Sequence, residues 1–207
     1  MRILFMILLA FMFASCGKKR SVHITATNVA TGERYPGLEY RIVSSVVGAE
    51  STKGTKIVAS GVLDANGEAV VELREKRTRR YVVRVIEPEN TCYNKQISMF
   101  FGSPFDENGH FNFEFAPCAY LKININNTNC QGAGDAMSFQ SRQSYTEWEG
   151  WNGDRTGCYS YTSPDFFQVP AGLRIYQWRV NRNGVITTGT DSIFLNAGES
   201  GTFNLNY

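Results

Sequence analysis

Internal repetition is the feature of this 207-residue chain that most restricts its fold. Three short segments of the first half recur in the same order in the second half, at separations of 99, 95 and 92 residues. The matched pairs are 22–28 with 121–127, 81–85 with 176–180, and 109–115 with 201–207. Matches in chain order indicate a module of about 95 residues that occurs twice. The alternative is that strands of ordinary alternation resemble one another.

The boundary between the two copies is expected at residues 116–117. Proline cannot donate a backbone hydrogen bond to a sheet, so Pro117 is expected to interrupt a strand. We therefore expect one domain over residues 21–116 and a second over 117–207.

Both copies show the pattern of β-strands. Apolar and polar residues alternate over 22–26, 38–42, 69–73 and 81–85, which places one face of each strand in a core. The tetrapeptide at 64–67 and the Asn183-Gly184 pair have the composition of tight turns. Beyond the N-terminal segment, no window has a helical period. The expected fold is all-β, with two tandem antiparallel β-sandwich domains of the transthyretin-like or immunoglobulin-like class.

The N-terminus indicates export. Residues 1–15 carry one arginine and an apolar run that is short for a membrane span and fits a signal peptide. Residues 13–16, Phe-Ala-Ser-Cys, resemble the bacterial lipobox, although leucine usually stands where Phe13 does. The resemblance implies that Cys16 is lipidated and that residues 16–20 form a short basic tether. The alternative is an ordinary signal peptide that leaves a free thiol.

The same resemblance suggests a destination. Gly17, which follows the cysteine, suggests delivery to the outer membrane, as in lipoproteins of bacteria with two membranes. Surface-exported lipoproteins of the Bacteroidetes tend to carry acidic residues after the cysteine, whereas this chain has Lys18, Lys19 and Arg20. The basic residues favour the periplasmic leaflet over the cell surface.

The number of cysteines agrees with a lipid anchor. Five cysteines are an odd number, and removing Cys16 leaves four that can form two disulfides in an oxidising compartment. Three pairings are possible. We favour Cys92–Cys118, which would fasten the domain junction, and Cys130–Cys158. The alternative, catalytic or metal-binding thiols, is disfavoured because no C-x-x-C spacing occurs.

One segment resembles a known domain family. The sequence SGVLDANGEAVVEL at 60–73, followed by YVVRV at 81–85, resembles the carboxypeptidase-regulatory-like, or transthyretin-like, family. VPAG at 169–172 is similar to the corresponding part of the second copy. The resemblance implies accessory or adhesive modules without catalysis, in a Bacteroidetes-like lipoprotein.

The search for catalytic motifs also favours a protein that is not an enzyme. The two histidines, His23 and His110, are too far apart for a local zinc motif, and residues 198–201 lack the pattern of a nucleophile elbow. We expect no catalytic residue, no metal and no cofactor. A net charge of +2 and an extracytoplasmic address make nucleic acid an unsuitable partner. Carboxylates that meet in space to hydrolyse glycosides are the alternative.

Two surface features suggest binding. The first is an aromatic segment over 145–167, in which the candidate ligand-binding residues are Tyr145, Glu147, Trp148, Glu149 and Trp151. Aromatic faces there could stack on sugar rings while carboxylates bind hydroxyl groups. The alternative is that these rings pack over the Cys130–Cys158 disulfide, and Trp178 is expected in the core.

The second feature is the run of five cations over 74–80, which could attract an anionic partner but could equally be a solvated hairpin loop. Ser192 lies in a short motif that resembles Bacteroidetes O-glycosylation acceptors, in an expected turn. Together these observations predict a lipid-anchored cell-envelope protein that serves as a non-catalytic binding or structural module with an envelope protein or a glycan as partner. The alternative is a glycan-binding accessory lipoprotein that uses Trp148 and Trp151.

Overall fold

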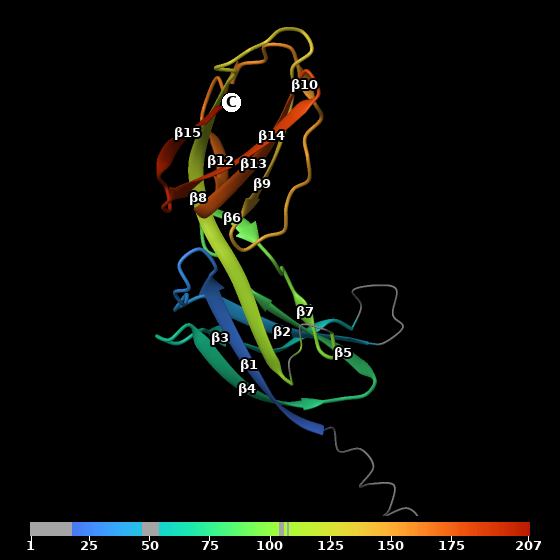
Figure 1. Cartoon of the computed structure of the whole chain (residues 1–207). Coiled ribbons are helices and arrows are strands. Elements are labelled where there is room, and N and C mark those ends of the chain that lie inside the picture. Colours follow the sequence, from blue (N-terminus) through green and yellow to red (C-terminus); the bar gives the residue numbers. More distant parts are fainter. Residues whose placement is uncertain (1–17, 47–53, 104–105, 107) are drawn as a thin grey trace, which may run out of the picture. The chain divides into compact units, whose positions relative to one another are not determined.

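The computed structural model describes residues 18–46, 54–103, 106 and 108–207. The described residues form fifteen strands and no helix, so the all-β expectation is confirmed (Figure 1). Within these ranges there is no helix long and apolar enough to cross a membrane. The segment predicted to be a signal peptide, residues 1–15, lies outside the described residues, as do Cys16 and Gly17.

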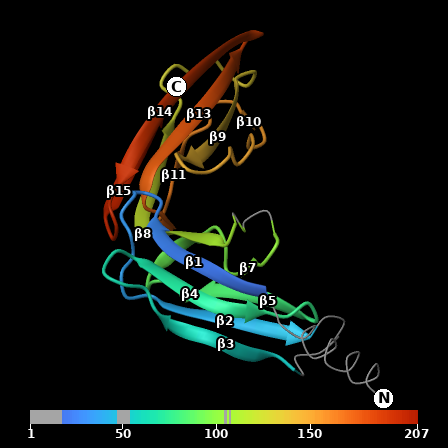
Figure 2. The same cartoon turned by 90° about the horizontal axis from the view of Figure 1, so that it is seen from below.

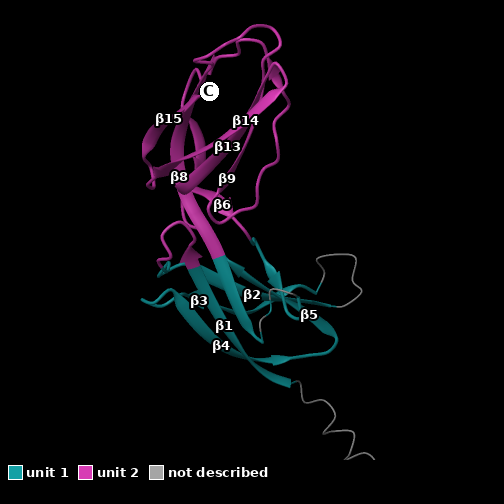
Figure 3. Ribbon diagram, in the orientation of Figure 1, with its two compact units in different colours: residues 1–26, 34–86, 96–113 teal, residues 27–33, 87–95, 114–207 magenta. Residues whose placement is uncertain are grey.

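The chain forms two compact units that are not continuous in sequence (Figure 3). Unit 1 contains residues 1–26, 34–86 and 96–113, and unit 2 contains 27–33, 87–95 and 114–207. The expected boundary at 116–117 falls inside one strand, β8 (His110–Asn126), which contributes residues to both units.

Pro117 does not interrupt β8, contrary to the expectation from its missing N–H group. The partner strand β6 (Thr91–Asn94) shifts its register beside Pro117, between Thr91 and Tyr93. A proline is tolerated at such an irregularity because no ladder donor is required there. The Pro117 carbonyl still accepts a bond of 2.8 Å from the N–H of Ala171.

Unit 1 is a sandwich of two sheets, visible as two layers in Figure 2. One sheet contains β1 (Lys18–Asn28), β4 (Glu68–Glu75) and the beginning of β8. The other has the order β3-β2-β5-β7, formed by β3 (Lys56–Val62), β2 (Glu39–Val46), β5 (Arg79–Val85) and β7 (Met99–Phe100). Alternate residues of both sheets are fully buried between them, among them Val22, Ile24, Ile42, Val83 and Phe113.

Unit 2 is also a sandwich. In its first sheet β8 pairs with β6, β11 (Tyr161–Thr162), β12 (Phe167–Pro170) and β15 (Ser200–Asn206). Its second sheet has the order β10-β9-β13-β14, formed by β10 (Arg155–Thr156), β9 (Ala136–Gln143), β13 (Gly172–Arg182) and β14 (Val185–Leu195). The core between them includes Leu121, Met137, Tyr176, Leu195 and Phe203.

The repeated segments occupy equivalent places in the two units. In unit 2, β8 and β15 pair in parallel, with Leu121 opposite Gly201. In unit 1, β1 neighbours β8, and the N–H of His23 donates to the Gly109 carbonyl at 2.8 Å. The matched segments 22–28 and 109–115 therefore meet in the same register as 121–127 and 201–207. The expectation of purely antiparallel sheets is wrong at this pair of strands.

The same side-chain bond bridges both of these strand pairs. The Thr25 hydroxyl donates to Asn112 Oδ1 at 2.8 Å, and the Asn124 amide donates to Asn204 Oδ1 at 2.9 Å. These residues are equivalent by the sequence repeat. Agreement in strand position, register and side-chain bonding supports a duplicated module.

A second shared feature is a buried tyrosine in the second matched pair of segments, 81–85 and 176–180. Tyr81 is paired with Ser44 across β5 and β2, and Arg79 donates to the Ser44 hydroxyl at 3.0 Å. Bonding to arginine satisfies a hydroxyl that would otherwise be buried at a cost. The equivalent residues in unit 2 are Tyr176, Ser141 and Arg174, with an Arg174–Ser141 bond of 2.7 Å.

The predicted turns are present. Gly67 has a φ of 68°, and the N–H groups of Asn66 and Glu68 both bond to Asp64 Oδ1 at 2.9 Å. Asn183 has a φ of 50°, which asparagine adopts more readily than most residues. The second turn connects β13 to β14, whose eleven paired positions make them a long hairpin.

Two disulfides are present, Cys92–Cys118 and Cys130–Cys158. All four cysteines belong to unit 2, so the first disulfide ties β6 to β8 within that unit. Cross-links of this kind typically contribute about 2–4 kcal/mol to the stability of a domain.

Residues Lys18 to Arg20 form the start of β1 rather than the tether that the sequence suggested. Arg20 forms ion pairs with Glu75 and with Asp106, whose side chain is 2% exposed. The Asp106 carboxylate also accepts the N–H groups of Gly102 at 2.6 Å and Gly109 at 2.7 Å. These bonds hold the first residues of the strand against unit 1.

The surroundings of Asp106 shift its ionisation. Burial by itself raises the pKa of Asp106, but the two backbone N–H groups and Arg20 outweigh burial, so the pKa is lowered. A lowered pKa in the folded state means that the ionised carboxylate stabilises the fold. That contribution is complete above the unfolded pKa of about 3.9 and is lost as pH falls through the lower folded value.

We predict that Asp106→Asn lowers the free energy of unfolding by about 1.5–3 kcal/mol at pH 7, because bonds to a charged group are lost. Denaturant titrations at several pH values would measure this. The gap to the wild type should narrow below about pH 4. The exposed Asp165→Asn is the control, expected within about 0.5 kcal/mol of wild type. A gap that does not depend on pH would contradict the prediction.

A candidate binding face on unit 2

The candidate site lies on the outer face of the β10-β9-β13-β14 sheet. Along β9 and β13, alternate residues such as Met137 and Tyr176 point into the core. The residues between them point outward, and on β9 and β13 they include Ser138, Gln140 and Arg179. Ser138 and Gln140 are nevertheless buried, at 1% and 8% exposure. Something other than the core therefore covers this side of the sheet.

The cover is the segment that follows β9, residues 144–156. The N–H of Glu149 bonds to the Ser141 carbonyl at 2.9 Å, and that of Asn152 bonds to Phe139 at 2.8 Å. Further on, β10 pairs with the start of β9, with Arg155 opposite Met137. The segment thus runs along the free edge of β9.

Trp148 and Trp151 lie on this segment and remain partly exposed, at 36% and 40%. The Arg142 guanidinium lies 4.9 Å from the centre of the Trp148 ring, and Arg179 lies 5.0 Å from that of Trp151. Arg142 extends from β9 and Arg179 from β13, both from outward positions. Cation–π contacts hold both rings over the outer face. We call these four residues the tryptophan face.

Polar groups lie between and beside the rings. The Gln140 amide donates to Gln177 Oε1 at 2.8 Å, and Arg179 Nε donates to the Ser138 hydroxyl at 2.8 Å. Arg142 Nε is buried without a hydrogen-bond partner in the part of the chain that the structure describes. A hollow of about 210 Å³ lies beside Arg179, the arginine that contacts Trp151. It is lined by Ala136, Ser138, Asp154, Arg179, Asn181 and Ile186.

Two of the expected ligand-binding residues lie elsewhere. The Tyr145 hydroxyl donates to the Ala171 carbonyl at 2.8 Å, and its ring lies 5.1 Å from that of Tyr93. The Glu149 carboxylate accepts bonds from Arg174 and from the Ser141 hydroxyl, at 2.8 and 2.6 Å. Tyr145 and Glu149 therefore have partners within unit 2, although the Glu149 side chain is still 54% exposed.

Glu147 remains exposed. The expected set of five residues thus separates into Trp148 and Trp151 on the outer face, an exposed Glu147, and two structural residues. Sequence reasoning missed Arg142, Arg179, Gln140 and Gln177. The sequence signal for these residues was that alternate positions of β9 and β13 are polar. This pattern predicts an outward face but does not show which segment covers it.

Burial and a neighbouring charge both affect the pKa of Tyr176. Burial raises the pKa of Tyr176, although the nearby guanidinium of Arg174 opposes the shift. Arg174 Nε donates to the Tyr176 hydroxyl at 3.1 Å. Arg174 therefore links a core tyrosine to Glu149 at the rim of the sheet.

Trp178 packs against the core of unit 2, as expected. Its ring lies so close to Gly189 on β14 that a Cβ atom there would come within 2.3 Å of it. A glycine in mid-strand is explained by this approach.

Ser192 lies in strand β14 rather than in a turn, because the Asn183-Gly184 hairpin extends that strand to Leu195. It is exposed and opposite Ile175, so it faces outward. Glycosylation of Ser192 stays a prediction.

The two histidines, which are too far apart in sequence for a local zinc motif, lie together in unit 1. The rings of His23 and His110 are stacked at 4.4 Å, because β1 and β8 are neighbours. Within the described ranges, no group of three or more His, Cys, Asp or Glu side chains could hold a metal ion.

Comparison with known proteins found matches among solved structures. No family model matches the chain, and no curated protein matches it. The Bacillus anthracis TIE protein is 19% identical over 91% of this chain, with a TM-score of 0.34, and the chain spans 34% of its length. The shaft pilin SpaA from Lactobacillus rhamnosus GG is 8% identical over 91% of this chain and 98% of its own, with a TM-score of 0.38. Because these TM-scores are below 0.5, nothing about function is carried over from these proteins.

We predict that Glu149→Ala lowers the stability of unit 2 by about 1 kcal/mol, because Arg174 and Ser141 lose a charged partner. Glu147→Ala removes the same charge two residues away from an exposed position and should stay within about 0.5 kcal/mol of wild type. Chemical denaturation of both variants measures the difference. Equal effects of the two substitutions would show that the Arg174 contact contributes nothing.

Proposed function

We propose that the protein is a lipid-anchored component of the cell envelope that acts as a non-catalytic binding or structural module. One observation carries the proposal: the four other cysteines are joined in two disulfides, which leaves Cys16 as the odd thiol. Cys16 follows an apolar leader and precedes the first residue of β1 by two positions. A lipidated cysteine at this position would tether a folded sandwich directly to a bilayer.

The proposal places the anchor in the outer membrane, with the periplasmic leaflet favoured over the cell surface. The residues after Cys16 support this location, since Gly17 is not a retention signal and Lys18 to Arg20 are basic. Membrane contact through the lipid and a partner in the envelope, either protein or glycan, follow from that location.

A second candidate function is glycan binding at the tryptophan face. Trp148 and Trp151 present partly exposed rings on one side of a sheet, each held by an arginine. Rings held in place lose little freedom on binding, and the apolar face of a sugar can stack on them. Gln177, which accepts a bond from Gln140 and is partly exposed, is suited to hydroxyl groups.

The lipid anchor predicts a specific loss. Replacing Cys16 with Ser removes the thiol that carries the lipid, so metabolic labelling with a fatty acid and retention in the membrane fraction should both be abolished. Replacing Ser15 with Ala keeps the thiol and a small residue beside it, and should leave both unchanged. Fatty-acid labelling that persists in the Cys16→Ser variant would refute the anchor.

The glycan candidate predicts saturable binding to at least one member of a panel of envelope and host glycans by residues 17–207. Trp148→Ala with Trp151→Ala should reduce that affinity at least tenfold, because each stacked ring contributes about 0.5–1.5 kcal/mol. The matched control is Tyr161→Ala with Phe167→Ala, whose side chains are 43% and 42% exposed on the other sheet. Binding that both variants lose equally would count against the tryptophan face.

A further inference from the structure

Two basic segments that are far apart in sequence meet at one end of unit 1. Strands β1 and β4 are antiparallel, with Lys18 opposite Glu75 and Lys19 opposite Arg74. The first residues of the described chain therefore lie beside the last residues of β4. The basic run at 74–80 begins at the same place and turns into β5.

The turn is short and its cations are exposed. The N–H of Arg79 bonds to the Lys76 carbonyl at 3.0 Å, which closes the connection between β4 and β5. Among the described residues, no acidic group lies within ion-pair distance of five of the cations at this end. We call this set the basic end of unit 1: Lys18, Lys19, Lys76, Arg77 and Arg80.

Neighbouring acids do not neutralise the basic end. Glu75 and Asp106 are both engaged by Arg20, which is outside the set. Asp106 is buried, and its pKa is lowered by bonds that outweigh the opposite effect of burial. The positive charge of the set therefore faces solvent.

An apolar row crosses the outer face of the sheet beside this charge. The strand registers place Ile57 opposite Val43, Val43 opposite Val82, and Val82 opposite Phe100. The two ends of the row, Ile57 and Phe100, are 55% and 51% exposed. These residues point away from the core, because their neighbours Ile42 and Val83 are fully buried.

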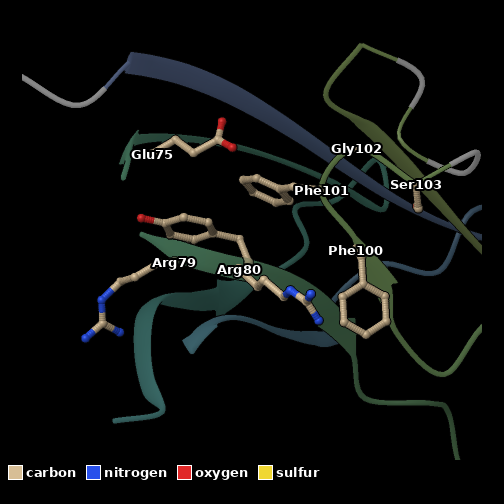
Figure 4. Close-up of a pocket in the computed structure, with 8 residues that line it drawn as sticks. Glu75, Arg79, Arg80, Phe100, Phe101, Gly102 and Ser103 are labelled. Carbon is tan, nitrogen blue, oxygen red and sulfur yellow. The ribbon is translucent and has the colours of Figure 1, made fainter. Parts of the chain in front are cut away.

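The charge and the apolar row meet at Arg80 and Phe100. Figure 4 shows the Arg80 side chain extending toward the Phe100 ring, while Arg79 extends away from it. Arg79 is held by the Ser44 hydroxyl and the Gly54 carbonyl, each at 3.0 Å, so Arg80 is the arginine available at this point. Arg80 and Phe100 both border a hollow of about 440 Å³, whose wall also includes Tyr81 and Ser103.

Basic side chains beside an exposed phenylalanine form a surface suited to the headgroup region of a bilayer. Cations attract anionic headgroups, and an apolar ring can enter the boundary with the acyl chains. Cys16 is two residues from Lys18, and two residues of chain span at most about 7 Å between Cα atoms.

We propose that the basic end and the Phe100 side of unit 1 dock on the anionic headgroups of the bilayer that holds the lipid anchor. The orientation rests on the proposed lipidation of Cys16, whereas the affinity for headgroups does not. Docking adds a second membrane contact to a single anchor. A polybasic patch beside a lipid anchor is a recognised second membrane signal.

Vesicle binding by residues 17–207 tests the proposal without a lipid anchor. The probes are phosphatidylcholine vesicles and phosphatidylcholine vesicles with 30% phosphatidylglycerol, a composition of roughly physiological negative charge. The protein should sediment with the anionic vesicles and not with the neutral ones. Binding should weaken as salt rises from about 0.05 to 0.5 M, because the attraction is screened.

Two variants locate the surface. Lys76→Gln, Arg77→Gln and Arg80→Gln together should reduce binding roughly 100-fold, since each cation near a charged bilayer contributes about tenfold or less. The control variant removes three cations of unit 2, through Lys95→Gln, Lys122→Gln and Arg155→Gln. It makes the same change in net charge and should reduce binding less than about threefold.

A second pair of variants tests the apolar contact. Phe100→Ser should weaken binding roughly tenfold at every salt concentration, because the ring no longer enters the interface. Phe194→Ser is the matched control, since Phe194 is also 51% exposed but lies on unit 2. It should bind like the wild type.

Three outcomes would overturn the proposal: no binding to anionic vesicles, equal losses in the basic-end and control variants, or binding only to an acidic protein. The result is independent of the anchor. If Cys16→Ser kept its fatty-acid label while residues 17–207 bound vesicles, lipidation of Cys16 would be refuted and docking supported. Loss of the fatty-acid label in Cys16→Ser, together with no vesicle binding by residues 17–207, would support lipidation and refute docking.

Discussion

The parallel pairing of the first and last strands of each copy is the constraint on which the rest of the structure depends. It places both ends of a module in the same sheet, and four of the strands between them form the opposite layer and close a core: β3-β2-β5-β7 in unit 1 and β10-β9-β13-β14 in unit 2. The last strand of the first copy and the first strand of the second are also one continuous strand, β8. The first residues of β8 complete a sheet of unit 1, and its later residues begin a sheet of unit 2. This double use explains why β8 is the longest strand described.

The sequence repeat and the alternation of apolar residues were sufficient to predict an all-β duplicated chain, because both depend on residues close together in sequence. Alternation is the same in parallel and antiparallel strands, so it could not predict the β8–β15 pairing. The prediction that Pro117 interrupts a strand was wrong for a related reason. A proline breaks a strand only where the sheet needs a backbone N–H donor at that position, and the register shift beside Pro117 removes that need. The stacking of His23 on His110 likewise depends on a strand pair that local sequence does not reveal.

The candidate site was predictable only where its residues make few contacts. Trp148 and Trp151 have polar neighbours in sequence, which favours exposure, and they are partly exposed. Tyr145 and Glu149 have similar neighbours, but their partners Ala171 and Arg174 lie more than twenty residues away along the chain. The arginines under the tryptophans were not predictable for the same reason. The registers of β9 with β13 and the path of the covering segment determine those contacts.

The two copies share bonds to buried residues but differ in their exposed residues, and this pattern supports separate roles for their surfaces. Arg79 and Tyr81 in the first copy correspond to Arg174 and Tyr176 in the second, and both arginines bond to a buried serine. On the same stretch, the cations Arg77 and Arg80 are replaced at the equivalent positions by Gly172 and Ile175. A side chain that satisfies a buried hydroxyl cannot be lost without an energetic cost, whereas an outward cation can. The basic end is thus a property of one copy and the tryptophan face of the other. A change that weakens headgroup binding in unit 1 therefore need not alter the aromatic surface of unit 2.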